Sequence, residues 1–361
     1  MRALLVARKS LRELLREPQL LLLVVLIPQL FVLITAFGYS GPLLATYPVL
    51  YGPGLGNTPL LAALADERYA DGRPVLALSP ATDERSVEAA LQDQSATAFI
   101  TMGAGGTGLT IRGDAVAMRF YRASVLLEDI VARQADRAVG RPQVIQLVER
   151  TPGGLGPQSE FDSYAPGMIV FALLLGVPQT TMLVAREVRW GTLRRLRLTR
   201  LGAADFYAGI SLAQLAVAGV QVPAVFAVAL AAGFHNQGSL LLALVVGLAI
   251  AFSAIGQGLL VACFVENDSQ AINLGSVVAM VQVLFSGAFY RLPPMTVGML
   301  AGHPIDLFDV FPATHGFLAL QQVLSYGAGL PEIAFRLAAT LVLSLLYLGL
   351  GIGVFRRLKG A

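Results

Sequence analysis

Residues 239–263 read SLLLALVVGLAIAFSAIGQGLLVAC, and this run decides the fold class of the chain. It is apolar over most of its length and contains no charged residue. At a rise of about 1.5 Å per residue, it is long enough to cross the ~30 Å hydrocarbon core of a bilayer. A helix is the only open-chain structure that satisfies its own backbone in lipid, so the run predicts a transmembrane helix.

Five further stretches have the same character, and the composition agrees with them. Hydrophobic residues make up 55% of the 361-residue chain and charged residues only 14%, against roughly 25% charged residues in a soluble domain. We expect an α-helical polytopic membrane protein with six transmembrane helices and an inserted small mixed α/β extracytoplasmic domain. The spans are predicted at 20–39, 165–184, 208–233, 239–263, 271–289 and 335–355. Pro28, Pro178 and Pro223 lie within spans and predict kinks.

Basic residues flank the predicted spans on one side. The loop 234–238 on the opposite side has no Lys or Arg, and the stretch 290–334 has only Arg291. Because Lys and Arg accumulate in cytoplasmic loops, we expect both termini in the cytoplasm and the spans in the inner (plasma) membrane. The basic clusters are Arg2, Arg8, Lys9, Arg12 and Arg16; Arg186, Arg189, Arg194, Arg195, Arg197 and Arg200; and Arg356, Arg357 and Lys359.

Residues 41–163 are predicted to form the domain outside the cytoplasm. Their ten arginines do not oppose this placement, because long translocated domains escape the positive-inside rule. Apolar runs predict strands at 74–78, 96–101, 108–112 and 143–148, and helical patterns predict helices at 83–94 and 124–139. The stretch 151–159, TPGGLGPQS, is the expected hinge to the second span, and residues 164–361 then hold spans two to six.

Two basic segments on the cytoplasmic side are amphipathic. In residues 1–18, Leu4, Ala7, Leu11 and Leu14 recur at heptad-like spacing, which predicts an interfacial helix ahead of the first span at 19–40. The loop 185–202, AREVRWGTLRRLRLTRLG, predicts a short helix that protrudes on the cytoplasmic side and against which a motor domain could push. For both segments the alternative is a basic anchor that only sets the topology.

The stretch 285–326, between the last two spans, is too apolar for an ordinary outer loop. Prolines interrupt it, and His303, Asp306, Asp309 and His315 make it a poor full span. We expect two half-helices that dip into the outer leaflet as a re-entrant hairpin over about 292–326. The spacing of these histidines and aspartates fits no compact metal-binding motif, so no metal site is predicted.

Polar residues within the spans are the remaining candidates for function. Such groups face the helix bundle, either as contacts between helices or as the lining of a pathway. No acidic residue is predicted deep in a span, which argues for an outside energy source rather than proton coupling. The candidates for a pathway or a dimer interface are Gln214, Gln221, Gln257, Asn273, Gln282 and Ser286.

The sequence contains none of the enzyme motifs that we considered. A phosphate-binding Gly-x-x-x-x-Gly-Lys-Ser/Thr loop is absent, and the only lysines are Lys9 and Lys359. Gly-x-Ser-x-Gly is absent as well, and the single cysteine, Cys263, can form neither an intrachain disulfide nor a cysteine cluster. We expect no catalytic residue, no cofactor and no metal in this chain, and no nucleic-acid partner at a net charge of +3.

Four short motifs, placed in order around the predicted spans, resemble the permeases of type-two ABC exporters (ABC-2), in the branch with a large outer domain between spans one and two. The resemblance covers essentially the whole chain. The motifs are Arg16-Glu17-Pro18; Phe161-Asp162-Ser163-Tyr164-Ala165-Pro166-Gly167; Arg186-Glu187 with Gly191-Thr192-Leu193; and Phe285-Ser286-Gly287-Ala288-Phe289-Tyr290 with Pro312-Ala313-Thr314-His315.

The resemblance implies an exporter subunit for a hydrophobic or amphipathic substrate such as a drug, lipid or antibiotic. Two permease chains, identical or related, would pair with two ABC ATPase subunits, which hold the ATP and Mg²⁺. Residues 1–18 would be the connecting helix, and the segment within about 186–200 the coupling helix seated in the ATPase. The residues implied in coupling are Arg186, Glu187, Arg189, Gly191, Thr192, Leu193, Arg194 and Arg195.

The chain departs from the family pattern at Arg194, where an acid is common, and at Arg200, where the family often has proline after Thr199. A more acidic groove on the ATPase would suit this basic loop. A different class of function stays open beside transport: a membrane-anchored protein whose outer domain binds or senses a ligand. A membrane enzyme ranks last, because no nucleophile–base set is visible.

Overall fold

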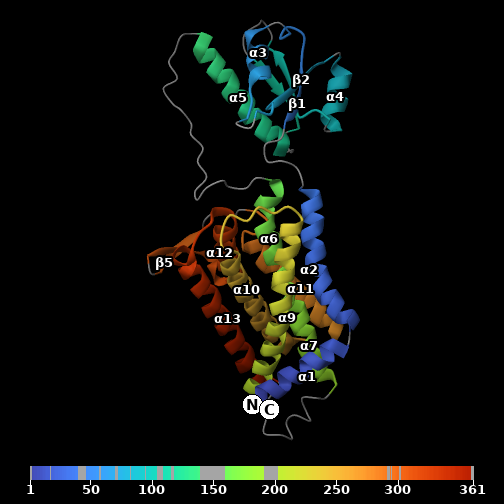
Figure 1. Ribbon diagram of the computed structural model, residues 1–361, viewed down its shortest axis with the longest axis vertical. Helices are drawn as coiled ribbons and strands as arrows, with labels where there is room; N and C mark the ends of the chain where they lie inside the picture. Colours follow the sequence, from blue (N-terminus) through green and yellow to red (C-terminus); the bar gives the residue numbers. More distant parts are fainter. Residues whose placement is uncertain are drawn as a thin grey trace. The chain divides into compact units, whose positions relative to one another are not determined.

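The computed structural model divides into two compact units, Met1–Gly41 with Thr151–Ala361, and Pro42–Arg150, and each is considered by itself. We call the first the helical unit and the second the α/β unit (Figure 1). The structure describes residues 2–16, 18–39, 46–56, 58–69, 72–81, 83–93, 95–103, 109–114, 118–138, 159–190, 202–290, 293, 295–300 and 302–358. The predicted strand at 143–148 and most of the hinge at 151–159 lie outside these ranges.

Long apolar helices make up most of the helical unit. Within the described ranges, four stretches are long and apolar enough to cross a membrane: Glu160–Arg189, Ala204–Ala231, Leu240–Phe264 and Leu330–Arg357. Their helices are α6 (Glu160–Leu174) with α7 (Gly176–Arg189), α9 (Ala203–Ala231), α10 (Leu240–Val261) and α13 (Leu330–Leu358). Helices α2 (Pro18–Gly38) and α11 (Asp268–Phe285) occupy the other two predicted spans. The chain is therefore a mostly helical polytopic membrane protein.

The surface of the helical unit is apolar where these helices face outward. Large aliphatic and aromatic side chains are exposed along α2, α11 and α13. A water-soluble protein rarely exposes such a contiguous apolar surface, whereas lipid covers it at no cost. These side chains include Leu26, Leu30, Ile34, Phe37, Ile272, Val277, Met280, Val342, Leu345, Leu346 and Leu350.

Helix α10, which contains the apolar run 239–263, is the centre of the helical unit. Ser239 caps its amino terminus by accepting a hydrogen bond from the Leu242 N–H. The helix packs against α7, α9, α12 (Pro312–Tyr326) and α13. Val246, Ile250 and Ala254 are buried within the core of the unit. A run that is apolar on nearly all sides is thus surrounded by other helices, as its composition requires.

The second predicted span is divided into two helices. Helix α6 ends at Leu174 and α7 begins at Gly176. Pro178 has no N–H to donate to the carbonyl of Leu174, so the helical hydrogen-bond ladder is interrupted here. Pro28 and Pro223, in contrast, lie inside the uninterrupted helices α2 and α9. The kink predicted at Pro178 therefore corresponds to a break between two helices.

Two glycines allow the neighbouring helices α10 and α11 to approach α7 closely, one on each side. A Cβ added at Gly258 of α10 would lie 2.7 Å from the Thr180 Cβ and 2.7 Å from the Val177 carbonyl oxygen. One added at Gly275 of α11 would lie 2.6 Å from the Pro178 Cα. The Thr181 hydroxyl donates to the Gly258 carbonyl at 3.1 Å. Helix α7 is therefore held between α10 and α11 with almost no free space.

The stretch between α11 and α13 differs from the expected pair of half-helices. One helix, α12, is present, but it is preceded by an antiparallel hairpin of β5 (Thr296–Leu300) and β6 (His303–Asp306) and a 3-10 turn, η2 (Leu307–Val310). The expectation of a first half-helix is wrong for the described residues. The five residues of β5 are all exposed, so pairing with β6 satisfies a backbone that has little packing to support a helix.

The α/β unit is built on a four-stranded sheet in the order β2-β1-β3-β4. The strands are β1 (Tyr47–Tyr51), β2 (Leu76–Pro80), β3 (Ala98–Met102) and β4 (Leu109–Arg112). β1 is parallel to β2 and to β3, whereas β3 and β4 are antiparallel. Parallel neighbours require crossovers, and α3 (Pro59–Asp66) and α4 (Glu84–Gln92) supply them. A third helix, α5 (Met118–Ala138), follows β4.

The core of the α/β unit comes from alternating strand residues and one face of each helix. Val49, Ala98 and Ile100 from the sheet are buried with Leu64 of α3 and Leu127 of α5. Three of the four predicted strands and both predicted helices are present, with slightly shifted ends. Strand β1 and helix α3 were not predicted.

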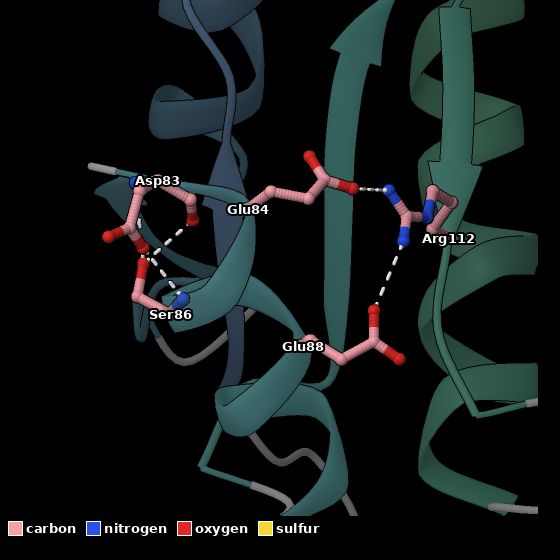
Figure 2. Close-up of polar contacts among 5 residues, drawn as sticks. All are labelled: Asp83, Glu84, Ser86, Glu88 and Arg112. Atoms are coloured by element: carbon pink, nitrogen blue, oxygen red, sulfur yellow. Dashed lines mark hydrogen bonds and ion pairs between the residues drawn. The ribbon is translucent and has the colours of Figure 1, made fainter.

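Helix α4 is fixed at its start by a capping box and along its side by one arginine. The Ser86 N–H donates to the Asp83 carboxylate at 2.7 Å, and the Asp83 N–H donates back to the Ser86 hydroxyl. Arg112 of β4 reaches Glu84 and, at 3.5 Å, Glu88 on the next turn of α4 (Figure 2). These exposed contacts set the direction of α4 relative to the sheet edge.

The capping box makes the stability of α4 depend on pH. The side-chain and backbone hydrogen bonds with Ser86 lower the pKa of Asp83 in the folded state. A lowered carboxyl pKa stabilises the fold above the unfolded pKa of ~3.9, and this stabilisation is lost as the pH falls through the folded pKa. We expect Asp83→Ala to speed amide exchange in α4 at neutral pH. The difference from the native chain should shrink as the pH falls below ~4; a difference that persisted in acid would contradict this origin.

Candidate functional site

The predicted amphipathic segment at the amino terminus is helix α1 (Arg2–Arg16), and it packs against α9. Val6 and Ala7 are buried in this contact, whereas Leu4, Leu5 and Leu15 are exposed. Gly209 of α9 gives the room, because a Cβ there would lie 2.5 Å from the Val6 Cβ. The exposed leucines are available to lipid beside the bundle, as expected of an interfacial helix.

An ion pair fixes α1 to the end of α7. The Lys9 ammonium lies 2.6 Å and 2.8 Å from the two carboxylate oxygens of Glu187. The Glu187 side chain is only 4% exposed, whereas that of Lys9 is 38% exposed and also lies 3.4 Å from Glu13. A buried carboxylate requires a charged or hydrogen-bonding partner. Glu187 therefore faces α1.

A second ion pair fixes the end of α7 to the start of α11. The Arg186 guanidinium donates to Asp268 at 3.1 Å, and Arg189 lies 3.8 Å from the same carboxylate oxygen. Asp268 is in the first turn of α11, where the positive end of the helix dipole also favours an acid. Three helices thus meet in one group of charges, which we call the ionic node: Lys9, Arg186, Glu187, Arg189 and Asp268.

The ionic node lies directly before the rest of the predicted coupling segment. Trp190 ends α7 and is 50% exposed. The predicted coupling residues Arg186, Glu187 and Arg189 are part of the node. The others lie outside the described residues: Gly191, Thr192, Leu193, Arg194 and Arg195.

Lys9 and Asp268 were not among the predicted coupling residues. Lys9 and Glu187 are 178 positions apart, and the sequence carries no signal of which basic residue would meet a given acid. One clue was present, since Glu187 is the sole acid in a basic loop and so requires a cation nearby.

The polar residues predicted within the spans fall into two groups. Gln257 of α10 and Gln282 of α11 are buried and exchange hydrogen bonds between their side-chain amides, and Gln257 also donates to Ser253 at 3.1 Å. Gln214 of α9 donates to Thr180 of α7 at 3.3 Å. These pairs join neighbouring helices, which favours the packing interpretation for them.

The other three candidates are not part of such pairs. Gln221 is buried, and its side-chain nitrogen has no hydrogen-bond partner among the described residues. Asn273 lies on the exposed face of α11. Ser286, just beyond α11, is buried and lines a cavity in the helical unit.

This cavity has a volume of about 530 Å³ and lies where α6, α11, α12, α13 and the β5–β6 hairpin converge. Aromatic rings and three charged side chains make up much of its wall. The residues are Ser163, Tyr164, Phe285, Ser286, Gly287, Ala288, Phe289, Tyr290, Pro293, Pro304, Asp306, Phe308, Asp309, Thr314, Phe317, Leu318, Gln321, Ser325, Tyr326 and Arg336. In Figure 1, α1 and the end of α13 lie at the opposite end of the helical unit from the β5–β6 hairpin.

The start of α6, within the motif Phe161–Gly167, is anchored by a buried carboxylate. Asp162 caps its own helix with Ser159 and accepts hydrogen bonds from the backbone N–H of His235, at 2.8 Å, and from its ring. The loop between α9 and α10 is thereby fixed to α6. Asp162 is a structural residue of the cavity end, which explains why an acid stands in this otherwise uncharged motif.

Nothing in the described residues resembles a catalytic or metal centre. No group of three or more His, Cys, Asp and Glu side chains in the described ranges could hold a metal ion. The charges tie helices to one another, and the 530 Å³ cavity is lined by the start of α6, the end of α11 and the β5–β6 hairpin. Long apolar helices with a cavity in their bundle define a polytopic membrane protein, the class to which membrane transport subunits belong.

The chain belongs to the ABC-2 family of transporter proteins, because the model of this family, described as ABC-2 family transporter protein, matches residues 80–352. No curated protein matches the chain. The resemblance found in the sequence motifs is thus confirmed at the level of the family. Membership makes the chain a membrane subunit of an ABC transporter that is not itself catalytic, and it implies an ABC ATPase as partner.

Proposed function

We propose that this chain is the membrane-spanning permease subunit of an ABC exporter, which moves a hydrophobic or amphipathic substrate. In this proposal six helices span the inner membrane, both termini and residues 186–200 face the cytoplasm, and the α/β unit lies outside. Two permease chains pair with two ATPase subunits that hold the ATP and Mg²⁺. Membership of the ABC-2 family and the absence of a phosphate-binding loop in the sequence support a permease role for this chain, with ATP hydrolysis in separate subunits.

The ionic node is the observation that carries the proposal. A force applied to the loop after Trp190 acts first on the end of α7. Because Glu187 is paired with Lys9 and Arg186 with Asp268, any shift of α7 pulls on α1 and on α11. Close packing at Gly258 and Gly275 prevents α7 from sliding past α10 and α11. In this proposal, a conformational change of the ATPase thereby moves α1, α7 and α11 together.

The same helix pair leads from the ionic node to the cavity. Helix α7 continues into α6 across the break at Leu175, and Ser163 and Tyr164 in the first turns of α6 line the cavity. A change in the angle at this break would move those residues relative to Phe285 and Tyr290. We propose that this movement opens the cavity when the ATPase subunits close.

Reconstitution with an ABC ATPase tests the function. The chain and an ABC ATPase that associates with it, in vesicles, should hydrolyse ATP faster when an amphipathic substrate is present. Gly191→Pro should abolish this stimulation while leaving the ATPase bound, because proline stiffens the segment that transmits the stroke. The matched control is Gly191→Ala, which removes the same glycine without the proline ring and should keep most of the stimulation. A failure of any ABC ATPase to associate with the native chain would contradict the proposal.

The second candidate function is a membrane-anchored binding or sensing protein. The α/β unit favours it, because this unit has its own sheet, its own hydrophobic core and its own compact set of contacts. Deletion of residues 42–150 separates the two candidates. Loss of ligand binding with unchanged ATPase association would indicate a receptor domain on a transporter. Loss of ligand binding from a chain with which no ABC ATPase associates, before or after the deletion, would favour the sensing protein.

A further inference from the structure

The 530 Å³ cavity in the helical unit has the size of a small-molecule site, since such sites usually measure about 300–1,000 Å³. Its walls come from segments that are far apart in the sequence, namely the start of α6, the end of α11, the hairpin and the start of α13. A site assembled from several helices of one bundle changes shape when those helices move. The cavity is therefore suited to bind and release a ligand during a transport cycle.

The apolar part of the wall is aromatic. Phe285 stacks on Phe308 with ring centroids 5.0 Å apart, and its ring is also parallel to that of Phe311 at 6.2 Å. Tyr164 and Tyr290 add rings that are apolar on their faces and polar at their hydroxyls. Such a surface can cover a hydrocarbon chain, and its ring faces attract organic cations.

The polar part of the wall carries charges of both signs that are not joined to each other. Arg336 of α13 is half-buried and is attracted electrostatically by Asp309 and Asp306. Among the described residues, however, no carboxylate oxygen lies within 4.0 Å of its guanidinium. A guanidinium at hydrogen-bonding distance from a carboxylate forms a strong, charge-assisted hydrogen bond. Here the cation and the two anions face one cavity across a gap.

The two carboxylates are held in place by their own segment. The Asp306 carboxylate accepts a hydrogen bond from the Thr296 hydroxyl at 2.9 Å, and that of Asp309 accepts one from the Asp306 N–H at 2.9 Å. The Asp309 side chain is nine-tenths buried, and its other oxygen is 4.0 Å from the His315 ring. A turn of either carboxylate toward Arg336 would break its hydrogen bond to Thr296 or to the Asp306 N–H, so these bonds favour the separation of charge.

The charge pattern distinguishes among ligands. A purely anionic ligand would pair with Arg336, but the two nearby carboxylates would repel it. A purely cationic ligand would pair with the carboxylates, but it would leave the Arg336 guanidinium unpaired and would be repelled by it. A molecule with one anionic and one cationic group satisfies both sides. We propose that the cavity binds a zwitterionic amphipath, with Arg336 holding the anionic group and Asp306 and Asp309 the cationic group. This inference rests on the proposed transport function, in which the bound zwitterion is the cargo or its headgroup.

The proposal is tested on the purified chain in a neutral maltoside detergent, without any ATPase, so that its outcome does not depend on the coupling mechanism. Dodecylphosphocholine, dodecyltrimethylammonium and dodecyl sulfate carry the same tail and differ in headgroup charge. Each would compete against a fluorescent lysophosphatidylcholine, with displacement followed by anisotropy. We expect the zwitterion to displace the probe at about tenfold lower concentration than either singly charged amphipath, as one charge-assisted hydrogen bond is lost in each of those cases.

Two substitutions should reverse the selectivity in opposite directions. Arg336→Gln should make the cationic amphipath the best competitor, whereas Asp309→Asn should shift the preference toward the anionic one. Asparagine keeps an oxygen that can accept from the Asp306 N–H, so the 3-10 turn is retained. The matched controls on α13 are Arg356→Gln and Glu332→Gln, which are exposed and do not line the cavity. Both controls should keep the native preference.

Free phosphocholine serves as a further competitor and identifies the source of the zwitterion. Competition by the headgroup alone assigns the site to small zwitterions, and a requirement for the tail assigns it to lipids; either result supports the proposal. Equal affinity of the native chain for all three amphipaths would overturn it, and so would a native preference for the cation or the anion. This comparison uses the native chain, so it decides the question even if a variant fails to fold. Loss of ATPase coupling with intact zwitterion binding would instead count against the proposed export function.

Discussion

Lys9→Met should release α1 from α7 and uncouple ATP hydrolysis from substrate. The substitution leaves the buried carboxylate of Glu187 without its cation. Removal of one partner of a fully buried pair costs about 3–5 kcal/mol, and the partial exposure of Lys9 lowers our expectation to about 2 kcal/mol. Amide exchange in α1 should rise by more than tenfold, and substrate-stimulated ATP hydrolysis should fall to the basal rate.

The other members of the pair provide the controls. Lys9→Arg keeps the charge and should retain most of the coupling. Arg12→Met removes a neighbouring charge that is exposed and should have little effect on exchange in α1. The double substitution Lys9→Met with Glu187→Gln removes the unpaired carboxylate and should recover part of the stability. Equal effects of Lys9→Met and Arg12→Met would show that the ion pair does not fix α1.

Gly258→Ala should have the second large effect, on the stability of the helical unit. The added Cβ would meet the Thr180 Cβ and the Val177 carbonyl oxygen, both at 2.7 Å. The carbonyl belongs to the backbone of α7, which Gly275 holds on its other side, so neither helix can easily move away. We expect a loss of about 3 kcal/mol, measured as a lower midpoint of unfolding in mixed micelles of dodecyl sulfate and maltoside.

Gly219→Ala is the matched control, because a Cβ added at Gly219 of α9 would meet no other described atom within 4 Å. Alanine there should be neutral or should stabilise the helix by up to about 1 kcal/mol, since it reduces backbone entropy. If Gly258→Ala were tolerated as well as Gly219→Ala, the close contact between α7 and α10 would not limit their movement.

Much of the helical architecture follows from local properties of the sequence. The run 239–263 predicts α10 because it contains no charge, and Ser239 at its start is a typical cap. Helix α4 follows from Asp83 and Glu84 at an amino terminus and from Val87 on the buried face. Four apolar helices bear out a polytopic membrane protein. The six-span topology and the sidedness of the termini stay predictions.

Other elements could not be predicted because they depend on distant partners. Strand β1, YPVLY, contains Pro48, which argues against a strand when the sequence is taken alone. In the fold β1 is central, and the Pro48 carbonyl still accepts from the Thr97 N–H at 2.7 Å. The β5–β6 hairpin was missed for a similar reason, since only the mutual pairing of its two strands distinguishes them from a half-helix.

In the candidate sites, too, some features follow from the local sequence and others depend on distant partners. Composition identified Arg186 and Glu187 as members of a basic, amphipathic segment, and the family resemblance implied that this segment contacts an ATPase. It could not show that both side chains turn inward to α1 and α11. Arg336 was not singled out by the sequence, because its role comes from the gap that separates it from Asp306 and Asp309. Contacts between distant segments, rather than residue type, determine where these side chains lie and what they face.

The sidedness of the bend after α7 is the most direct test of the central claim, which is that ATP energy reaches this chain from a cytoplasmic ATPase. Cys263 is the single cysteine, so Cys263→Ala gives a background free of thiols. In that background, Trp190→Cys places a thiol at an exposed position beside the ionic node. A membrane-impermeant maleimide added to intact cells should leave this thiol unlabelled, and labelling should appear once the cells are permeabilised. Labelling in intact cells would place the bend outside the cytoplasm and contradict the account.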